Sequence, residues 1–139
     1  MPELKNPNLR LAEVIDAVRK FHDAFGIENQ NAPKADVTEQ VVELRYNLMR
    51  EENEEYLEAA RRGDLTEIAD ALGDMLYILC GAILTHGLQH KIEEVFLEIQ
   101  RSNKSKLDAN GKPVYREDGK VLKSELYEKP DIARILSSE

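Results

Sequence analysis

The chain has few of the residues that build disulfide-linked or zinc-bound proteins. Its 139 residues include one cysteine, Cys80, and three histidines. A lone cysteine in an apolar run cannot form an internal disulfide and is expected to be a packed thiol. None of His22, His86 and His90 lies in an acidic cluster or follows a glutamate by three residues. This argues against a structural zinc site and against the Glu-x-x-His pattern of di-iron helix bundles.

Positive net charge and an unbroken membrane-length apolar run are also missing. The net charge of −8 argues against general binding to a nucleic-acid backbone. The most apolar stretch, residues 68–84, contains Asp70, Gly73 and Asp74, so we expect no membrane span. No signal-peptide pattern opens the chain, and we expect a cytoplasmic protein. The length and the 42% of hydrophobic residues predict a single domain over residues 1–139.

Charge is unevenly distributed along this domain. Residues 101–139 carry nine Lys/Arg and seven Asp/Glu, out of 19 and 27 in the whole chain, which leaves ten and twenty for residues 1–100. An acidic body, with a helical core at about 9–102, therefore precedes a basic arm at about 103–130. The turn dipeptides Asn110-Gly111 and Asp118-Gly119 predict that residues 112–127 form a small hairpin or a loop that orders on binding.

Apolar residues recur at helical spacing in four segments before the arm. The expected helices cover residues 9–25, with Asn8 as its cap, then 38–62, 67–84 and 90–101. Residues 26–35 are expected to form a loop, and Gly87 to end the third helix. The predicted fold class is all-α, a four-helix bundle with a basic C-terminal arm.

Two acidic stripes dominate the second and third helices. Glu67, Asp70 and Asp74 fall within roughly 60° of one another on a helix, and residues 51–55 read Glu-Glu-Asn-Glu-Glu. The short link 62–64, in which Gly63 ends one helix and Asp64 caps the next, predicts an antiparallel hairpin. Glu52 and Asp74 then both lie roughly 16 Å from the turn, so the stripes can face each other.

Simpler explanations exist for each part of these stripes. Glu67 has the spacing of a capping box with Asp64, which would direct its carboxylate back to the Asp64 amide. The run 51–58 could be a solvated acidic face. Asp70 and Asp74 lie on a helix without another polar face, so their alternative is an internal salt bridge. The candidate cations for it are Arg45 and Arg62.

The functional interpretation is a divalent-metal site. Oxygen ligands from Asp and Glu suit hard cations, Mg²⁺ or alternatively Mn²⁺. Clustered carboxylates with Mg²⁺ indicate phosphate chemistry, in which the metal activates water and stabilises the leaving group. The basic arm could then neutralise a polyphosphate, or it could be a solubilising or subunit-contact extension. The cations concerned are Arg101, Lys104, Lys106, Arg116, Lys120 and Lys123.

These residues resemble a known family pattern. Glu51-Glu52-x-x-Glu55 followed by Glu67-x-x-Asp70 is similar to the paired motif of the all-α nucleoside triphosphate pyrophosphohydrolases, which include MazG-like and phosphoribosyl-ATP pyrophosphohydrolases. The resemblance continues in the sequences DALGDMLY, RSNKSK and DGKVLK, at 70–77, 101–106 and 118–123, and in Phe-His-x-x-Phe at 21–25.

The resemblance implies an enzyme that cleaves between the α and β phosphates of a nucleotide and releases pyrophosphate. Glu52, Glu55, Glu67 and Asp70 would hold Mg²⁺, and Glu51 would be a further ligand or the base that activates water. Asp74, one turn beyond the motif, would contact the metal ligands without binding the metal itself. Phosphate, sugar or nucleotide contacts would come from Asn103, Lys106, Lys120, Lys123 and Tyr127. The resemblance also implies a homodimer or a dimer of dimers.

Substrate choice stays open at this stage. The arm resembles the branch that clears non-standard or excess nucleotides, which favours a (deoxy)nucleoside triphosphate as substrate. Phosphoribosyl-ATP of histidine synthesis is an alternative substrate. A non-catalytic helical module that binds a basic partner or a metal is a third hypothesis. Base choice is expected to depend on groups near Phe21, Phe25 and Asn29.

Overall fold

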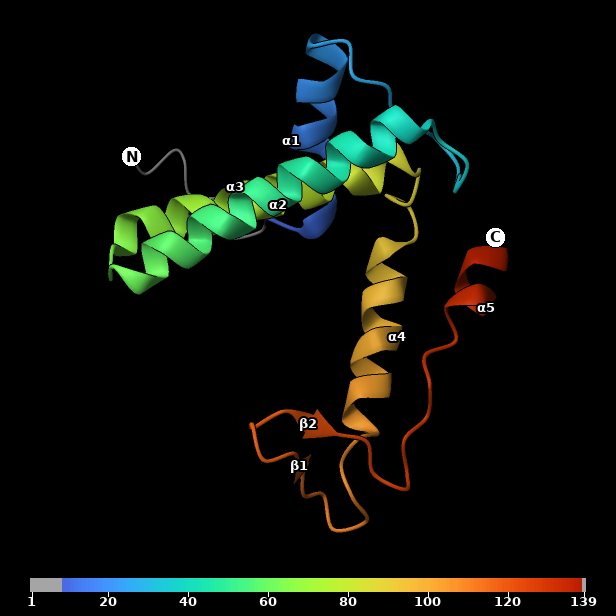
Figure 1. Cartoon of the computed structure of the whole chain (residues 1–139). Coiled ribbons are helices and arrows are strands. Elements are labelled where there is room, and N and C mark those ends of the chain that lie inside the picture. Colours follow the sequence, from blue (N-terminus) through green and yellow to red (C-terminus); the bar gives the residue numbers. More distant parts are fainter. Residues whose placement is uncertain (1–8, 139) are drawn as a thin grey trace. The chain divides into compact units, whose positions relative to one another are not determined.

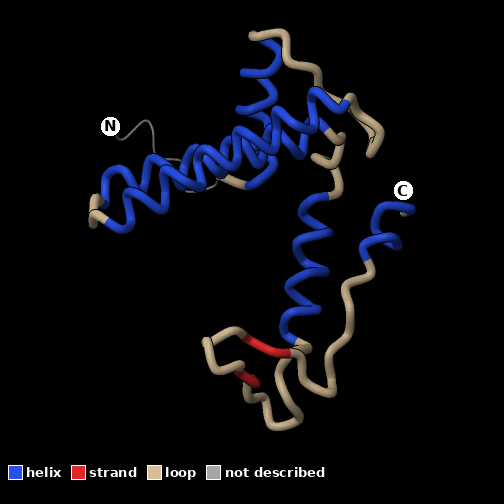
Figure 2. Tube along the Cα trace, viewed as in Figure 1, coloured by secondary structure: helices blue, strands red, loops and turns tan. Residues whose placement is uncertain are grey.

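The computed structural model describes residues 9–138, and Asn8, the expected first cap, lies outside them. The chain divides into two compact units, one ending at Gln89 and the other starting at His90. Helices make up most of the described residues, with one two-stranded sheet in the second unit (Figure 1, Figure 2). The expected all-α fold class is confirmed.

The first unit contains α1 (Leu11–Ala24), α2 (Glu39–Arg61) and α3 (Leu65–Thr85). α2 and α3 run antiparallel and pack along each other, and α1 packs on α3 (Figure 1). In the turn between α2 and α3, Gly63 has a φ of +70°. The Asp64 carboxylate at the start of α3 accepts a hydrogen bond from the Glu67 amide at 3.1 Å. The predicted helical hairpin, with both of its end signals, is therefore confirmed.

Apolar side chains from α1 and α3 form the core of this unit. Ile15 and Val18 of α1 are buried, as are Cys80 and Leu84 of α3. Burial raises the pKa of the Cys80 thiol, as expected for a packed cysteine. α3 is long and apolar enough to cross a membrane by length and composition, a test that core helices of soluble proteins also pass. Only a third of its most apolar window is buried.

The loop between α1 and α2 is fastened to the carboxyl end of α3. The amides of Gln30 and Lys34 donate to the carbonyls of Leu84 at 3.0 Å and His86 at 2.8 Å. These bonds satisfy carbonyl groups that a helix end otherwise leaves free. Gly87 makes the close approach feasible, because at φ +66° a Cβ atom on it would collide with the Ala32 carbonyl oxygen.

The second unit contains α4 (Ile92–Lys104), the hairpin β1 (Val114–Tyr115) and β2 (Val121–Leu122), and α5 (Ile132–Ser137). The strands pair antiparallel, with Val114 opposite Leu122, so the predicted small hairpin is confirmed. α4 begins two residues later and ends three residues later than expected.

Helix α5 was not predicted from the sequence. Its six residues are too few for a clear apolar repeat, and its local signal is the Asp131 carboxylate, which accepts the Arg134 amide at 3.2 Å. Tertiary contacts supply the rest, since α5 packs on α4 and buries Ile135. Glu98 of α4, which is 7% exposed, accepts the Asp131 amide at 2.7 Å and Arg101 Nη2 at 2.8 Å.

We expect Gly87→Ala to lower the free energy of unfolding by about 3 kcal/mol, from the left-handed backbone and the collision together. Gly63→Ala is the matched control, because Gly63 has a similar φ and nothing within 4 Å of the added Cβ. It should cost only about 1 kcal/mol. Urea unfolding of both variants measures the difference, and equal losses would contradict the close approach at Gly87.

Glu98 should make the second unit sensitive to acid. The hydrogen bonds from Arg101 and from the Asp131 amide lower the pKa of Glu98 to about 2, from an ordinary 4.5. Its stabilising effect is therefore complete above about pH 4.5 and is lost as the pH falls towards 2. The protection factors of the α5 amides against hydrogen exchange should fall over this range in the wild type. In Glu98→Gln these protection factors should be low already at pH 7. Glu94→Gln, at an exposed position of α4, should behave as wild type.

Candidate metal centre

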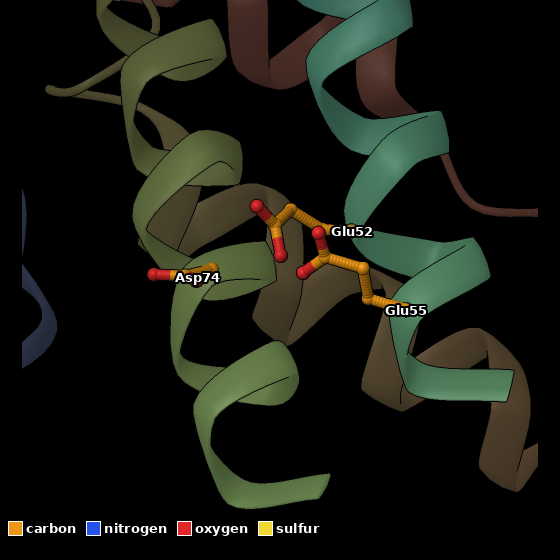
Figure 3. Close-up of side chains that lie close together, drawn as sticks. All are labelled: Glu52, Glu55 and Asp74. Carbon is orange, nitrogen blue, oxygen red and sulfur yellow. The ribbon is translucent and has the colours of Figure 1, made fainter. Parts of the chain in front are cut away.

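Three carboxylates meet between α2 and α3. Glu52 and Glu55 lie one helical turn apart on α2, and Asp74 lies on α3 (Figure 3). Each offers one oxygen atom, and these atoms all lie within 4.8 Å of one another. We call Glu52, Glu55 and Asp74 the carboxylate trio. The antiparallel hairpin brings the three together because Glu52 and Asp74 are nearly equally far from its turn.

The trio is strained electrostatically when no cation is bound. The pKa of Glu52 is raised to about 7, first because its carboxyl is partly buried and next because it shares a hydrogen bond with Glu55. The negative charges of Asp74, Glu55 and Asp70 raise it further. Such repulsion is what a bound divalent cation would remove.

The hydrogen bonding of Glu52 also fits a metal ligand. Its Oε2 atom is buried and has no hydrogen-bond partner among the described residues. An unsatisfied buried carboxylate oxygen is costly, and coordination to a cation would satisfy it. With oxygen donors only, the trio suits Mg²⁺ or Mn²⁺ rather than a thiophilic metal.

The other predicted ligands lie outside the trio. Glu51, Glu67 and Asp70 are exposed, although Asp70 is near enough to Glu52 to affect its pKa. Asp74, which was expected to act from behind the ligands, instead brings its own oxygen to the cluster. The ligand set as a whole stays a prediction. The signal for Asp74 was present in the sequence, as its level on the hairpin matches that of Glu52.

The two simpler explanations for the acidic residues of α3, an internal salt bridge and a capping box, apply only in part. Arg62 pairs with Asp64 at 3.8 Å, and Arg45 donates to the Ile78 carbonyl at 2.7 Å. Within residues 9–138 neither arginine forms a salt bridge to Asp70 or Asp74. The Asp64 amide donates to the Ala59 carbonyl, so only the forward half of the capping box forms. The aspartates of α3 therefore keep their charges available.

The cations of the arm fall into two groups. Arg116 is held by the Asp118 carboxylate and Arg101 by Glu98, so both side chains have anionic partners. The lysines of the arm form no ion pair within 4 Å in the part of the chain that is described, and Lys123 Nζ lies 4.7 Å from the centre of the Tyr127 ring. The cations of the arm without an ion pair in the described residues are thus its six lysines, which include Lys104, Lys106, Lys120 and Lys123.

The side chains expected to select a base are partly engaged already. Phe21 packs on Phe25, at 4.5 Å between ring centres, and on Tyr77 at 5.7 Å. Asn29 Oδ1 lies 2.6 Å from Nδ1 of the buried His22.

A cavity of about 290 Å³ lies along α2, one turn before Glu52, and sequence reasoning did not find it. Apolar side chains line it together with four charged ones, Glu28, Lys34, Asp36 and Arg45. Among the described residues, the buried Nε of Arg45 has no hydrogen-bond partner. Apolar walls with polar groups between them suit a flat heterocycle. The apolar lining includes Ile27, Val41, Leu44 and Leu48.

Removing one charge from the trio should stabilise the metal-free protein. Because the folded-state pKa of Glu52 is about 7, against an ordinary 4.5, the wild type should lose stability as the pH rises from 4.5 to 7. In chelator at pH 8, Glu52→Gln should therefore be more stable, on the order of 1 kcal/mol because partial exposure screens the repulsion. At pH 4.5 the difference should vanish.

Mg²⁺ or Mn²⁺ should raise the melting temperature of the wild type and have less effect on Glu52→Gln. The control is Glu54→Gln, on the same helix but outside the trio, which should respond as wild type. Thermal melts with and without metal at the two pH values measure both effects. A metal response unchanged in Glu52→Gln would exclude this residue as a ligand.

Comparison with known proteins gives one clear result. A family model described as phosphoribosyl-ATP pyrophosphohydrolase matches residues 18–103, well over half of the chain. The match includes α2, α3 and the trio but ends before most of the basic arm. No curated protein gives a significant match. The chain belongs to the phosphoribosyl-ATP pyrophosphohydrolase family, within the MazG-like superfamily, which supports a nucleotide pyrophosphohydrolase activity in general.

Proposed function

We propose that this protein hydrolyses the α–β phosphate bond of a (deoxy)nucleoside triphosphate, releasing the monophosphate and pyrophosphate, as a cytoplasmic house-cleaning enzyme. The observation that carries the proposal is the carboxylate trio, in which a buried oxygen of Glu52 lacks a hydrogen-bond partner among residues 9–138. Family membership supplies the reaction class. Acidic clusters without an ion are common, so the two observations are needed together.

In this proposal the acidic residues of the first unit bind the metal and activate the attacking water. Glu52, Glu55 and Asp74 would hold Mg²⁺, with Glu67 and Asp70 as further ligands on the exposed side. When bound, the ion would lower the pKa of a water molecule and neutralise phosphate charge. Glu51 is exposed beside Glu52 and would accept the proton of the attacking water.

Phosphate recognition is assigned to the arm. Lys106, Lys120 and Lys123 lack anionic partners in the described part of the chain, and a triphosphate would supply them. Asn103 and Tyr127 would contact the sugar or a phosphate. Arg116 is the weaker candidate, because a phosphate would have to displace Asp118 from its guanidinium.

The size of the cavity beside α2 is our reason to favour a nucleoside triphosphate over phosphoribosyl-ATP. At about 290 Å³, it is of a size for one heterocycle with part of its sugar. Phosphoribosyl-ATP carries a second sugar phosphate on its base, for which this volume leaves little room. Phosphoribosyl-ATP stays the second candidate substrate, since the matching family model bears its name.

The working form is proposed to be a homodimer or a dimer of dimers. Leu72, Leu76 and Leu79 lie along one stripe of α3 and are 49%, 47% and 48% exposed. Leu57 of α2 is also exposed. A second copy of the hairpin would bury these side chains in a helix bundle, each fully buried leucine contributing about 2 kcal/mol.

The proposal is tested by pyrophosphate release from a panel of nucleotides with Mg²⁺. The panel contains dUTP, dCTP, dATP, dGTP, the ribonucleotides and phosphoribosyl-ATP. We expect release from one or a few nucleoside triphosphates, abolished by chelator. Release from phosphoribosyl-ATP alone would replace the proposed substrate, and no release from any would favour the non-catalytic helical module.

Glu55→Gln, Asp70→Asn and Asp74→Asn should each reduce turnover by more than about 100-fold while the proteins stay folded. Glu54→Gln is the control and should keep near-normal turnover. Steady-state pyrophosphate release and circular dichroism measure the two properties. If Asp74→Asn alone kept its activity, Asp74 would not bind the metal itself. It would then contact the metal ligands, as the family resemblance implies.

A further inference from the structure

We propose that three serines at the end of α4 and in the arm form a clamp that positions the phosphate-binding lysines before a nucleotide arrives. Ser102, Ser105 and Ser124 are the members of this serine clamp. The inference rests on the proposed function, because it assigns to these serines the placement of lysines that the proposed reaction uses. All contacts lie within the second unit.

Ser102 and Ser105 hold both backbone polar groups of one residue, Glu128. They lie one turn apart, Ser102 in the last turn of α4 and Ser105 at its cap. Ser102 Oγ is in a buried side chain and donates to the Glu128 carbonyl at 2.8 Å. Ser105 Oγ accepts the Glu128 amide at 2.8 Å and donates to the Ser102 carbonyl at 2.6 Å. The backbone of Glu128 is thereby fixed to the helix end.

Ser124 fixes the other end of the same segment. Its hydroxyl donates a hydrogen bond that the carbonyls of Leu107, at 2.7 Å, and Ser105, at 3.1 Å, share. The same oxygen accepts the Leu126 amide at 3.1 Å. Residues 124–128 have no helix or strand, so these side chains take the place of regular backbone pairing. Both ends of a short segment are tied to α4 and its continuation.

The fixed segment carries or adjoins the proposed phosphate contacts. Lys123 immediately precedes Ser124, and its Nζ lies over the ring of Tyr127 inside the segment. Lys106 immediately follows Ser105. The clamp therefore ties a lysine from the helix end and a lysine from the strand end to one rigid set of hydrogen bonds. Fixing the backbone beside Lys106 and Lys123 before binding lowers the entropy cost of placing these side chains on a phosphate.

A solubilising or subunit-contact arm would not need this arrangement. Lysines that only increase solubility can stay mobile, and most surface lysines do. Here a nearly fully buried serine and a cation–π contact are placed at the base of the lysines. Within residues 9–138, Lys106 and Lys123 form no ion pair with the nearby Asp108 or Glu125, and Asp108 instead accepts the amides of Asn110 and Lys112. The arrangement suits cations kept ready for an external anion.

The experiment compares Ser105→Ala and Ser124→Ala with Ser105→Thr, which keeps the hydroxyl, and with Ser137→Ala. Ser137 lies on α5, and in the described part of the chain its hydroxyl donates to the carbonyl of Arg134, outside the clamp. Three readouts are used on the full chain: kcat and KM for the best nucleotide of the panel, binding of Mg²⁺-tripolyphosphate by calorimetry, and hydrogen exchange of residues 123–128.

We expect the two alanine variants to raise KM and weaken tripolyphosphate binding about fivefold each, with kcat nearly unchanged at saturation. Exchange at residues 123–128 should become faster without nucleotide and recover when it is bound. Ser105→Thr should restore KM, and Ser137→Ala should not alter it.

Two results would overturn the proposal, and they are distinguishable. If the wild type is active but the alanine variants keep its KM, tripolyphosphate affinity and exchange rates, the clamp does not position the lysines and the proposed function stands. If the wild type releases no pyrophosphate from any nucleotide, the proposed function fails and the clamp loses its purpose with it. A fall in kcat alone would also contradict a positioning role.

Discussion

Repulsion among the carboxylates between α2 and α3 is the constraint on which the first unit depends. Side chains that repel one another stay together only if the helices carrying them are held by other forces. Here those forces are the apolar contacts of α1, α2 and α3 and a turn with a glycine and an aspartate cap. The packing thus spends some of its stability on keeping charges close, which is usual for a site built for cations.

The same helices leave large apolar side chains exposed on part of the hairpin. α3 contributes Cys80, Ile83 and Leu84 to the core near its carboxyl end, where α1 crosses it. Nearer the turn, Leu72 and Leu76 stay about half exposed. The acidic residues occupy the same half of the hairpin. Apolar side chains and carboxylates are therefore exposed together on this part of α3.

Much of this arrangement could be predicted from residue spacing. Gly63 and Asp64 gave the turn, and equal counting along both helices placed Asp74 opposite Glu52. The sequence could not show which carboxylates come together as candidate ligands. That depends on which single oxygen atoms are buried, and a periodic pattern of residues does not resolve single atoms. It also missed α5, whose six residues are held by Glu98, thirty-three positions before Asp131 in the chain. Contacts of that range leave no local signal.

Each of the two units leaves charges of one sign unpaired at the residues assigned to the proposed function. A site that holds a metal triphosphate needs both carboxylates and lysines, yet the two would neutralise each other if they were allowed to pair. In residues 9–138 the trio has no cationic partner, and Lys106, Lys120 and Lys123 have no anionic one. Arginines near the arm are paired instead with Glu98 and Asp118. The chain satisfies its structural charges internally and leaves those of the proposed site for the substrate and its metal.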